Sequence, residues 1–90
     1  MSVNEIARLK VKSAQRATFV EEAHTFAKIL ASDGGCHHVE MLQGVEHPDS
    51  FVFVITWDSR EAHKAFQGSD HGRQAISTIV SYLACFLANV

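Results

Sequence analysis

The chain has 90 residues, of which 47% are hydrophobic and 20% are charged, and its formal net charge is −2. This length predicts a single domain over residues 1–90, and the lack of a Lys/Arg run argues against nucleic acid or an anionic membrane as a partner. No apolar run approaches the ~20 residues that span a bilayer, and the charged start lacks a secretory pattern, so we expect a cytoplasmic protein. The two cysteines, Cys36 and Cys85, form no CxxC pair and are expected to stay reduced.

Alternation and helical spacing divide the first half of the chain into three elements. Alternating apolar and charged residues predict a half-buried strand over residues 5–12. Apolar residues at i, i+3, i+4 and i+7 predict a helix over residues 14–32, which the turn residues Asp33-Gly34-Gly35 end. A second strand is expected over residues 35–43.

A third strand is expected over residues 51–57, after a proline-containing turn. Both of its faces are apolar, which predicts a central strand that is covered on both sides. Asp58 is expected to cap the helix that follows, with Glu61 three residues later completing a capping box. One face of the strand carries its largest side chains, namely Phe51, Phe53, Ile55 and Trp57.

The chain ends with a break, a helix and a strand. The break runs from Gly68 to Gly72, the helix over residues 73–80 and the strand over residues 82–90. The order β-α-β-β-α-β predicts a ferredoxin-like α+β sandwich, a four-stranded antiparallel sheet with its helices on one face. A second copy would cover the other face, which predicts a homodimer in which two sheets form a dimeric α/β barrel. Whether Cys36 approaches Cys85 across that interface stays open.

A ligand pocket is expected between the sheet and the helices, beside the only tryptophan, Trp57. Core packing alone is the alternative for this indole. His63 shares a helix face with Phe66 and would point towards the cavity, whereas His71 lies in the break. Either imidazole can accept a phenolic proton near neutral pH, and both are candidate catalytic groups together with Trp57. The alternative for His63 is a partly exposed helix histidine without a catalytic role. The alternative for His71 is a residue that caps the last helix.

Further residues are expected to line the pocket. Neighbouring residues on a strand point to opposite faces, and we expect His37 on the helix side with Met41, and His38 on the dimer side. The other expected contacts to substrate are apolar or aromatic: Phe53, Ile55, Phe66 and Tyr82. For Tyr82, packing at the interface is the alternative. The six histidines show no HxH, HxxxH or HExxH spacing, so no metal site is expected.

With these motifs the chain resembles the antibiotic biosynthesis monooxygenase family of dimeric α/β-barrel proteins. The resemblance covers nearly the whole chain and is clearest at Gly35-Cys36, Ile55-Thr56-Trp57, the helix start with Asp58, Ser59, Glu61 and Ala62, and Ser69-Asp70-His71. It implies oxygenation of a small, electron-rich quinol or anthrone with molecular oxygen, without a metal or flavin cofactor. The protein would supply an apolar cavity, an aromatic wall and a group that takes the phenolic proton.

The chain departs from the family pattern at four positions. Many members carry an acid two residues before the tryptophan and a histidine nine residues after it, where this chain has Ile55 and Phe66. Polyketide-oxidising members place an amide where Phe53 stands, and haem-degrading members an asparagine where Ala7 stands. Trp57 and His71 are what remains of the pattern.

Three functions are therefore in competition. The first is a cofactor-independent monooxygenase that acts on a small aromatic molecule and oxygen. The second is a non-catalytic dimeric protein that binds an apolar ligand. The absence of the family's polar side chains at Ile55, Phe66 and Phe53 favours this function. The third is haem binding with oxidative ring opening, which the missing first-strand asparagine argues against.

Overall fold

The chain folds into four strands and three α-helices in the computed structural model, which describes the backbone of residues 1–89 and the side chains of residues 1–84. Two short 3-10 turns, Ser13–Gln15 and Val80–Tyr82, precede the first helix and the last strand. The elements are β1 (Val3–Val11), α1 (Arg16–Ala31), β2 (Cys36–Gln43), β3 (Ser50–Trp57), α2 (Arg60–Gln67), α3 (Asp70–Ser77) and β4 (Leu83–Asn89).

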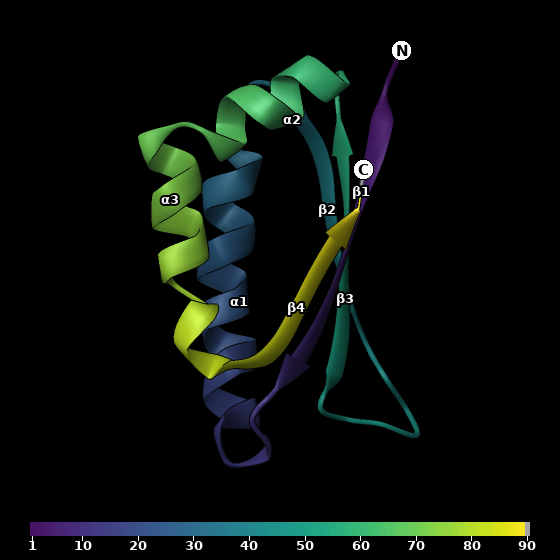
Figure 1. Cartoon of the computed structure of the whole chain (residues 1–90), viewed down its shortest axis with the longest axis vertical. Helices are drawn as coiled ribbons and strands as arrows, with labels where there is room; N and C mark the ends of the chain where they lie inside the picture. The colour runs from purple at the N-terminus through teal and green to yellow at the C-terminus, as the bar shows by residue number, and fades with distance from the viewer. Residues whose placement is uncertain (90) are drawn as a thin grey trace.

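The strands form one antiparallel sheet in the order β2-β3-β1-β4. All three helices lie on the same side of this sheet (Figure 1). The predicted ferredoxin-like α+β architecture is therefore confirmed, with β1 and β3 in the centre. The last α-helix lies earlier than expected, because α3 begins at Asp70, inside the predicted break, and ends at Ser77.

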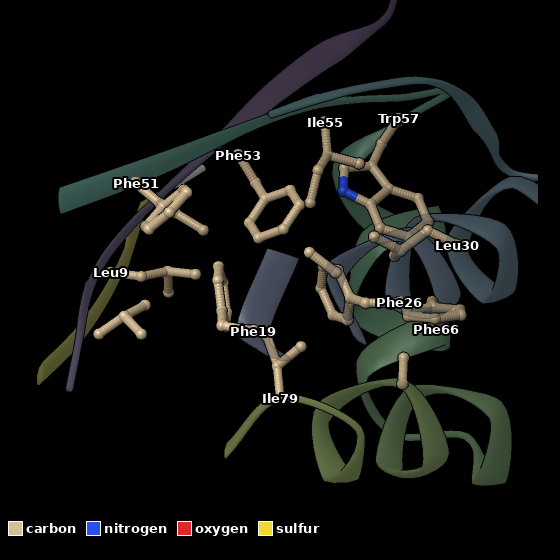
Figure 2. Packing of buried hydrophobic residues seen from close by; sticks show 14 residues of the cluster. Leu9, Phe19, Phe26, Leu30, Phe51, Phe53, Ile55, Trp57, Phe66 and Ile79 are labelled. Atoms are coloured by element: carbon tan, nitrogen blue, oxygen red, sulfur yellow. The ribbon is translucent and has the colours of Figure 1, made fainter. Parts of the chain in front are cut away.

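The hydrophobic core lies between β1, β3 and the helices. Alternate residues of β3, from Phe51 to Trp57, are buried and point towards the helices (Figure 2). Helix α1 contributes the matching face through Phe19, Ala23, Phe26 and Leu30. The rings of Phe26 and Phe53 lie 4.8 Å apart, within the range of favourable aromatic pairs. Each large side chain that is fully buried stabilises the fold by ~1.5–3 kcal/mol.

Serine side chains determine where α2 and α3 begin. The hydroxyl of Ser59 accepts a hydrogen bond from the Ala62 backbone N–H at 3.0 Å, so Ser59 caps α2 and the prediction of Asp58 as the cap is wrong. The hydroxyl of Ser69 accepts in the same way from Gly72 at 3.0 Å. This second cap starts α3 within the stretch from Gly68 to Gly72 that was expected to be a break.

The sheet face opposite the helices is only partly shielded within the chain. Val52, Val54 and Thr56 of β3 are half-buried there, whereas their neighbours on the helix side are fully buried. Leu42 on β2 is 48% exposed. The expectation that β3 is covered on both faces would require a further layer against this surface. None of the described helices is both long and apolar enough to cross a membrane.

Candidate active site

A cavity of about 270 Å³ lies between the centre of the sheet and the three helices. Its walls are mostly apolar, and β1, β3, α1, α2 and α3 all contribute to it. The side chains and backbone that line it belong to Glu5, Ala7, Phe26, Leu30, Phe53, Ile55, Trp57, His63, Phe66, Gln67, Gly72, Ala75, Ile76 and Ile79.

Trp57 forms one end of the cavity. Its indole is completely buried, and its Nε1 donates a hydrogen bond to Glu5 Oε1 at 3.0 Å. The indole packs against the imidazole of His63, with ring centres 5.4 Å apart, and against Phe66, at 5.2 Å. The hydrogen bond fixes the polar edge of the indole, and the contacts with the two neighbouring rings fix its position.

A carboxylate and an imidazole meet at this end of the cavity. Glu5 Oε1 lies 3.3 Å from His63 Nε2, and the two side chains are only 12% and 11% exposed. Glu5 is directly opposite Ile55 in the pairing of β1 with β3, so its side chain is on the helix side of the sheet. Of the side chains described in residues 1–84, Glu5 and His63 are the two acidic or basic ones that line the cavity. Together they can accept, hold and return a proton.

Helix α2 brings His63 to this position. The Ser59 cap sets the start of the helix, and the His63 N–H makes the first-turn bond to the Ser59 carbonyl at 3.2 Å. His63 and Phe66, three residues apart, then face the sheet together, as the helical spacing predicts. The predicted orientation of His63 towards the cavity is thus what the structure shows.

Close packing between α2 and α3 completes the cavity wall. Gly72 is buried, and a Cβ at this position would lie 2.0 Å from the carbonyl oxygen of Phe66. A side chain is therefore incompatible with this approach of the two helices. The same first turn of α3 leads to Ala75 and Ile76, which also line the cavity.

Five of the residues predicted for the site do meet in this cavity: Trp57, His63, Phe53, Ile55 and Phe66. Sequence reasoning missed Glu5, although the alternation of the first strand contained the signal. Glu5 occupies the same face as the buried Ala7, Leu9 and Val11, and a charged residue on a core-facing position marks a functional candidate. The contribution of α3 was missed because its first turn was expected to be a break.

The other four predicted residues lie outside the cavity lining. His71 is exposed on the first turn of α3. Met41 packs against the core from β2, on the helix side as predicted. Tyr82 lies in the 3-10 turn before β4, with its ring edge against Phe19 at 6.4 Å.

His37 was expected on the helix side with Met41, and this prediction is wrong. The pairing of β2 with β3 shifts between Cys36 and His38, so a β-bulge removes His37 from the alternation. Cys36 takes the position opposite Trp57, and the exposed His37 instead has its Nε2 3.4 Å from Asp58 Oδ1. The question of a Cys36–Cys85 contact falls on a side chain outside the described residues.

Within the described residues, no three His, Cys, Asp or Glu side chains are arranged to share a metal ion. The pKa of the nearby Cys36 thiol is raised, chiefly by burial. This thiol is therefore mostly protonated near neutral pH.

Comparisons with known proteins agree with this architecture. Residues 2–78 match the family described as antibiotic biosynthesis monooxygenase. No curated protein matches the chain. Among solved structures, a candidate antibiotic biosynthesis monooxygenase from Bordetella bronchiseptica has a TM-score of 0.87 at 19% identity, over 99% of this chain and 95% of that one.

Two further structures are similar to the same extent. A candidate antibiotic biosynthesis monooxygenase from Nitrosomonas europaea has a TM-score of 0.86 at 18% identity, over 98% of this chain and 86% of that one. A conserved protein from Methanosarcina mazei has a TM-score of 0.87 at 17% identity, over 99% and 89% of the two chains. Identities this low establish the shared fold alone.

An acid and a histidine lie next to the two family positions that are apolar in this chain. The acid position is Ile55, and Glu5 lies directly opposite it on β1. The histidine position is Phe66, and His63 lies three residues, or about one helical turn, before it. The cavity therefore has a carboxylate and an imidazole beside Trp57, neither of them at the position where the family pattern has it.

Proposed function

Because the chain belongs to the antibiotic biosynthesis monooxygenase family, we propose that it is a monooxygenase that oxidises a small quinol- or anthrone-like aromatic with oxygen and without a cofactor. One observation carries the proposal: the Glu5–His63 pair lies beside Trp57 in an otherwise apolar cavity. That arrangement combines a proton acceptor with an aromatic wall, and these are the two features that oxidation of a phenol needs from a protein.

The Glu5–His63 pair takes the phenolic proton in the proposed reaction: the substrate hydroxyl donates to the carboxylate of Glu5, and His63, whose Nε2 lies 3.3 Å from that carboxylate, holds the proton. The resulting phenolate gives one electron to oxygen, and the substrate radical and superoxide combine into a peroxide anion. This anion takes the proton back from the Glu5–His63 pair and becomes a hydroperoxide. Loss of water from the hydroperoxide leaves a quinone. The substrate thereby loses two hydrogens and gains one oxygen atom, and the second oxygen atom leaves as water, so the substrate itself is the only reductant.

The apolar walls support this chemistry. Side chains such as Phe26, Phe53 and Ile55 exclude water from the substrate ring and offer it large contact surfaces. In a site with little water, the charge of the Glu5–His63 pair acts on the hydroxyl group more strongly than it would in solution.

Oxygen uptake by the purified, metal-free protein tests the proposal, with hydroquinones and anthrone as substrates. We expect His63→Ala to lower kcat ~100-fold and Trp57→Phe to raise KM, because the indole is a wall of the cavity. His47→Ala, in the exposed turn between β2 and β3, is the matched control and should behave as the wild type. No uptake with any substrate would contradict the proposal.

His71 remains a competing candidate for the catalytic histidine, and His71→Ala belongs in the same series. The exposed position of His71 favours little effect on kcat. A loss as large as that of His63→Ala would instead mean that α3 rearranges around the substrate.

A non-catalytic ligand-binding protein is the second candidate function. It is favoured by the small number of polar side chains that line the described part of the cavity, namely Glu5, His63 and Gln67. In that case hydroquinones would raise the melting temperature of the protein while oxygen uptake stayed at the background rate.

We also propose that the protein is a homodimer in which two sheets pack face to face. The uncovered face of the sheet carries Ile6, Val52 and Val54, all half-buried within one chain, and the exposed Leu42. A second copy would remove these apolar side chains from water. Light scattering at micromolar concentration should give the mass of two chains.

A further inference from the structure

Glu5 places a carboxylate in the wall of the cavity, beside the indole N–H of Trp57. We propose that Glu5 makes this cavity selective for an uncharged aromatic ring that carries a hydroxyl donor, and excludes aromatic carboxylates. The inference rests on the proposed function for the choice of hydroxylated rings, and the binding preference itself can be measured without turnover.

The carboxylate is held in place by two contacts on one of its oxygens. Glu5 Oε1 accepts the hydrogen bond from Trp57 Nε1 and lies within 3.3 Å of His63 Nε2. Among the described residues, none donates a hydrogen bond to Glu5 Oε2. A carboxylate oxygen can accept more than one hydrogen bond, so Oε2 has capacity for a donor that a ligand brings.

The cavity lining offers little to an anion. Among the residues whose side chains the structure describes, no lysine or arginine lines it, and the Nε2 atom of His63 already faces Glu5. The indole N–H of Trp57 is also used by Glu5. A ligand carboxylate would thus meet a like charge in a partly dry site, and this repulsion weakens its binding. A phenolic hydroxyl would instead donate to the carboxylate.

The volume of the cavity limits the size of the ring system. An apolar cavity of ~150 Å³ in another protein binds one benzene ring. The volume of about 270 Å³ here, which is less than twice as large, therefore suits roughly one or two fused rings. Among the proposed substrates, this limit favours small hydroquinones over anthrone, which has three fused rings.

Calorimetric titration without oxygen tests the inference, with 2,5-dihydroxybenzamide and 2,5-dihydroxybenzoate as the probes. The two compounds share their shape, and only the benzoate is charged. We expect the wild type to bind the amide at least ~10-fold more tightly than the acid, because of the like charge of Glu5. In Glu5→Gln, which keeps an acceptor for Trp57, we expect the preference to fall below ~3-fold through tighter binding of the acid. Glu40→Gln, at an exposed residue of β2, should retain the wild-type preference.

The site of binding can be read from Trp57. The chain has one tryptophan, so its NMR spectrum contains a single indole N–H signal, which should move when the amide binds. Equal affinities for the two compounds in the wild type, no binding of either, or an unchanged preference in Glu5→Gln would each overturn the inference. If Glu5→Gln fails to fold, the wild-type preference and the indole signal still decide.

The outcomes for the two proposals are separable. A clear preference for the amide without any oxygen uptake would refute the monooxygenase and leave the selectivity intact. Oxygen uptake with equal affinity for amide and acid would refute the selectivity and leave the monooxygenase intact.

Discussion

Replacing Gly72 by alanine should strongly destabilise the protein, because the added methyl group has no space. The new Cβ would lie 2.0 Å from the carbonyl oxygen of Phe66, 3.0 Å from its carbonyl carbon and 3.3 Å from the Cα of Gln67. All three atoms belong to the backbone of α2, so no side-chain rotation can relieve the contact. The first turn of α3 would have to move away from α2.

The expected cost follows from this geometry. Overpacking a well-packed interior costs ~1–3 kcal/mol, and a backbone contact that cannot yield belongs at the upper end. For a domain of this size, 1 kcal/mol corresponds to a change in melting temperature of ~4–8 °C. Gly72→Ala should therefore melt ~12–24 °C below the wild type. Thermal unfolding followed by circular dichroism measures the difference.

Gly34→Ala is the matched control, because no atom lies within 4 Å of the Cβ that it would add. Its melting temperature should stay close to that of the wild type. Gly72 also lines the cavity, so any folded Gly72→Ala protein should bind hydroquinones more weakly. A Gly72→Ala protein that melts with the wild type would refute the idea that α2 and α3 must approach this closely.

Three further predictions concern other parts of the chain. The hydrogen bond from Ser13, together with Arg16, lowers the pKa of Asp49. The stabilisation that comes with a lowered pKa is present above the unfolded pKa and is lost as the pH falls through the folded pKa. Asp49→Asn should therefore lower the melting temperature at neutral pH and approach the wild type only in acid, below the folded pKa of Asp49. Burial raises the pKa of the Cys36 thiol, so iodoacetamide should label Cys36 more slowly in the folded protein than in urea at neutral pH, as peptide mass spectrometry can show. Val54→Arg, on the uncovered sheet face, should convert the proposed dimer to a monomer, and a dimeric mass by light scattering would contradict the proposed interface.

Much of the fold could be predicted because each element has a clear period. The third strand, with large residues on alternate positions, was predicted over residues 51–57 and runs from Ser50 to Trp57. The start of α3 could not be predicted in the same way. Two glycines within five residues favoured a break, and the Ser69 cap and the close contact at Gly72 become evident only when α2 and α3 are seen together.

The candidate site, like the fold, could be predicted only in part from the sequence. His63 and Phe66 could be placed on the cavity side, because helical spacing fixes their common face. The side of the sheet on which His37 lies could not be predicted, because a β-bulge shifts the alternation of β2 by one residue there. The residue pattern of this strand does not indicate the bulge. Glu5 could have been recognised from its core-facing position, but its partners could not be named from the sequence. Those contacts depend on the register that places Glu5 opposite Ile55.

The bond between Trp57 and Glu5 joins residues that are 52 positions apart. It can form only after β1 has paired with β3, which requires a long loop of chain to close. We therefore expect the site to assemble late during folding, after the local turns of the helices have formed. Fraying of the first few residues of β1 would also withdraw the carboxylate while the core around Phe19 and Phe51 stayed packed. Such a site can lose its activity when only the start of β1 detaches, while the rest of the protein stays folded.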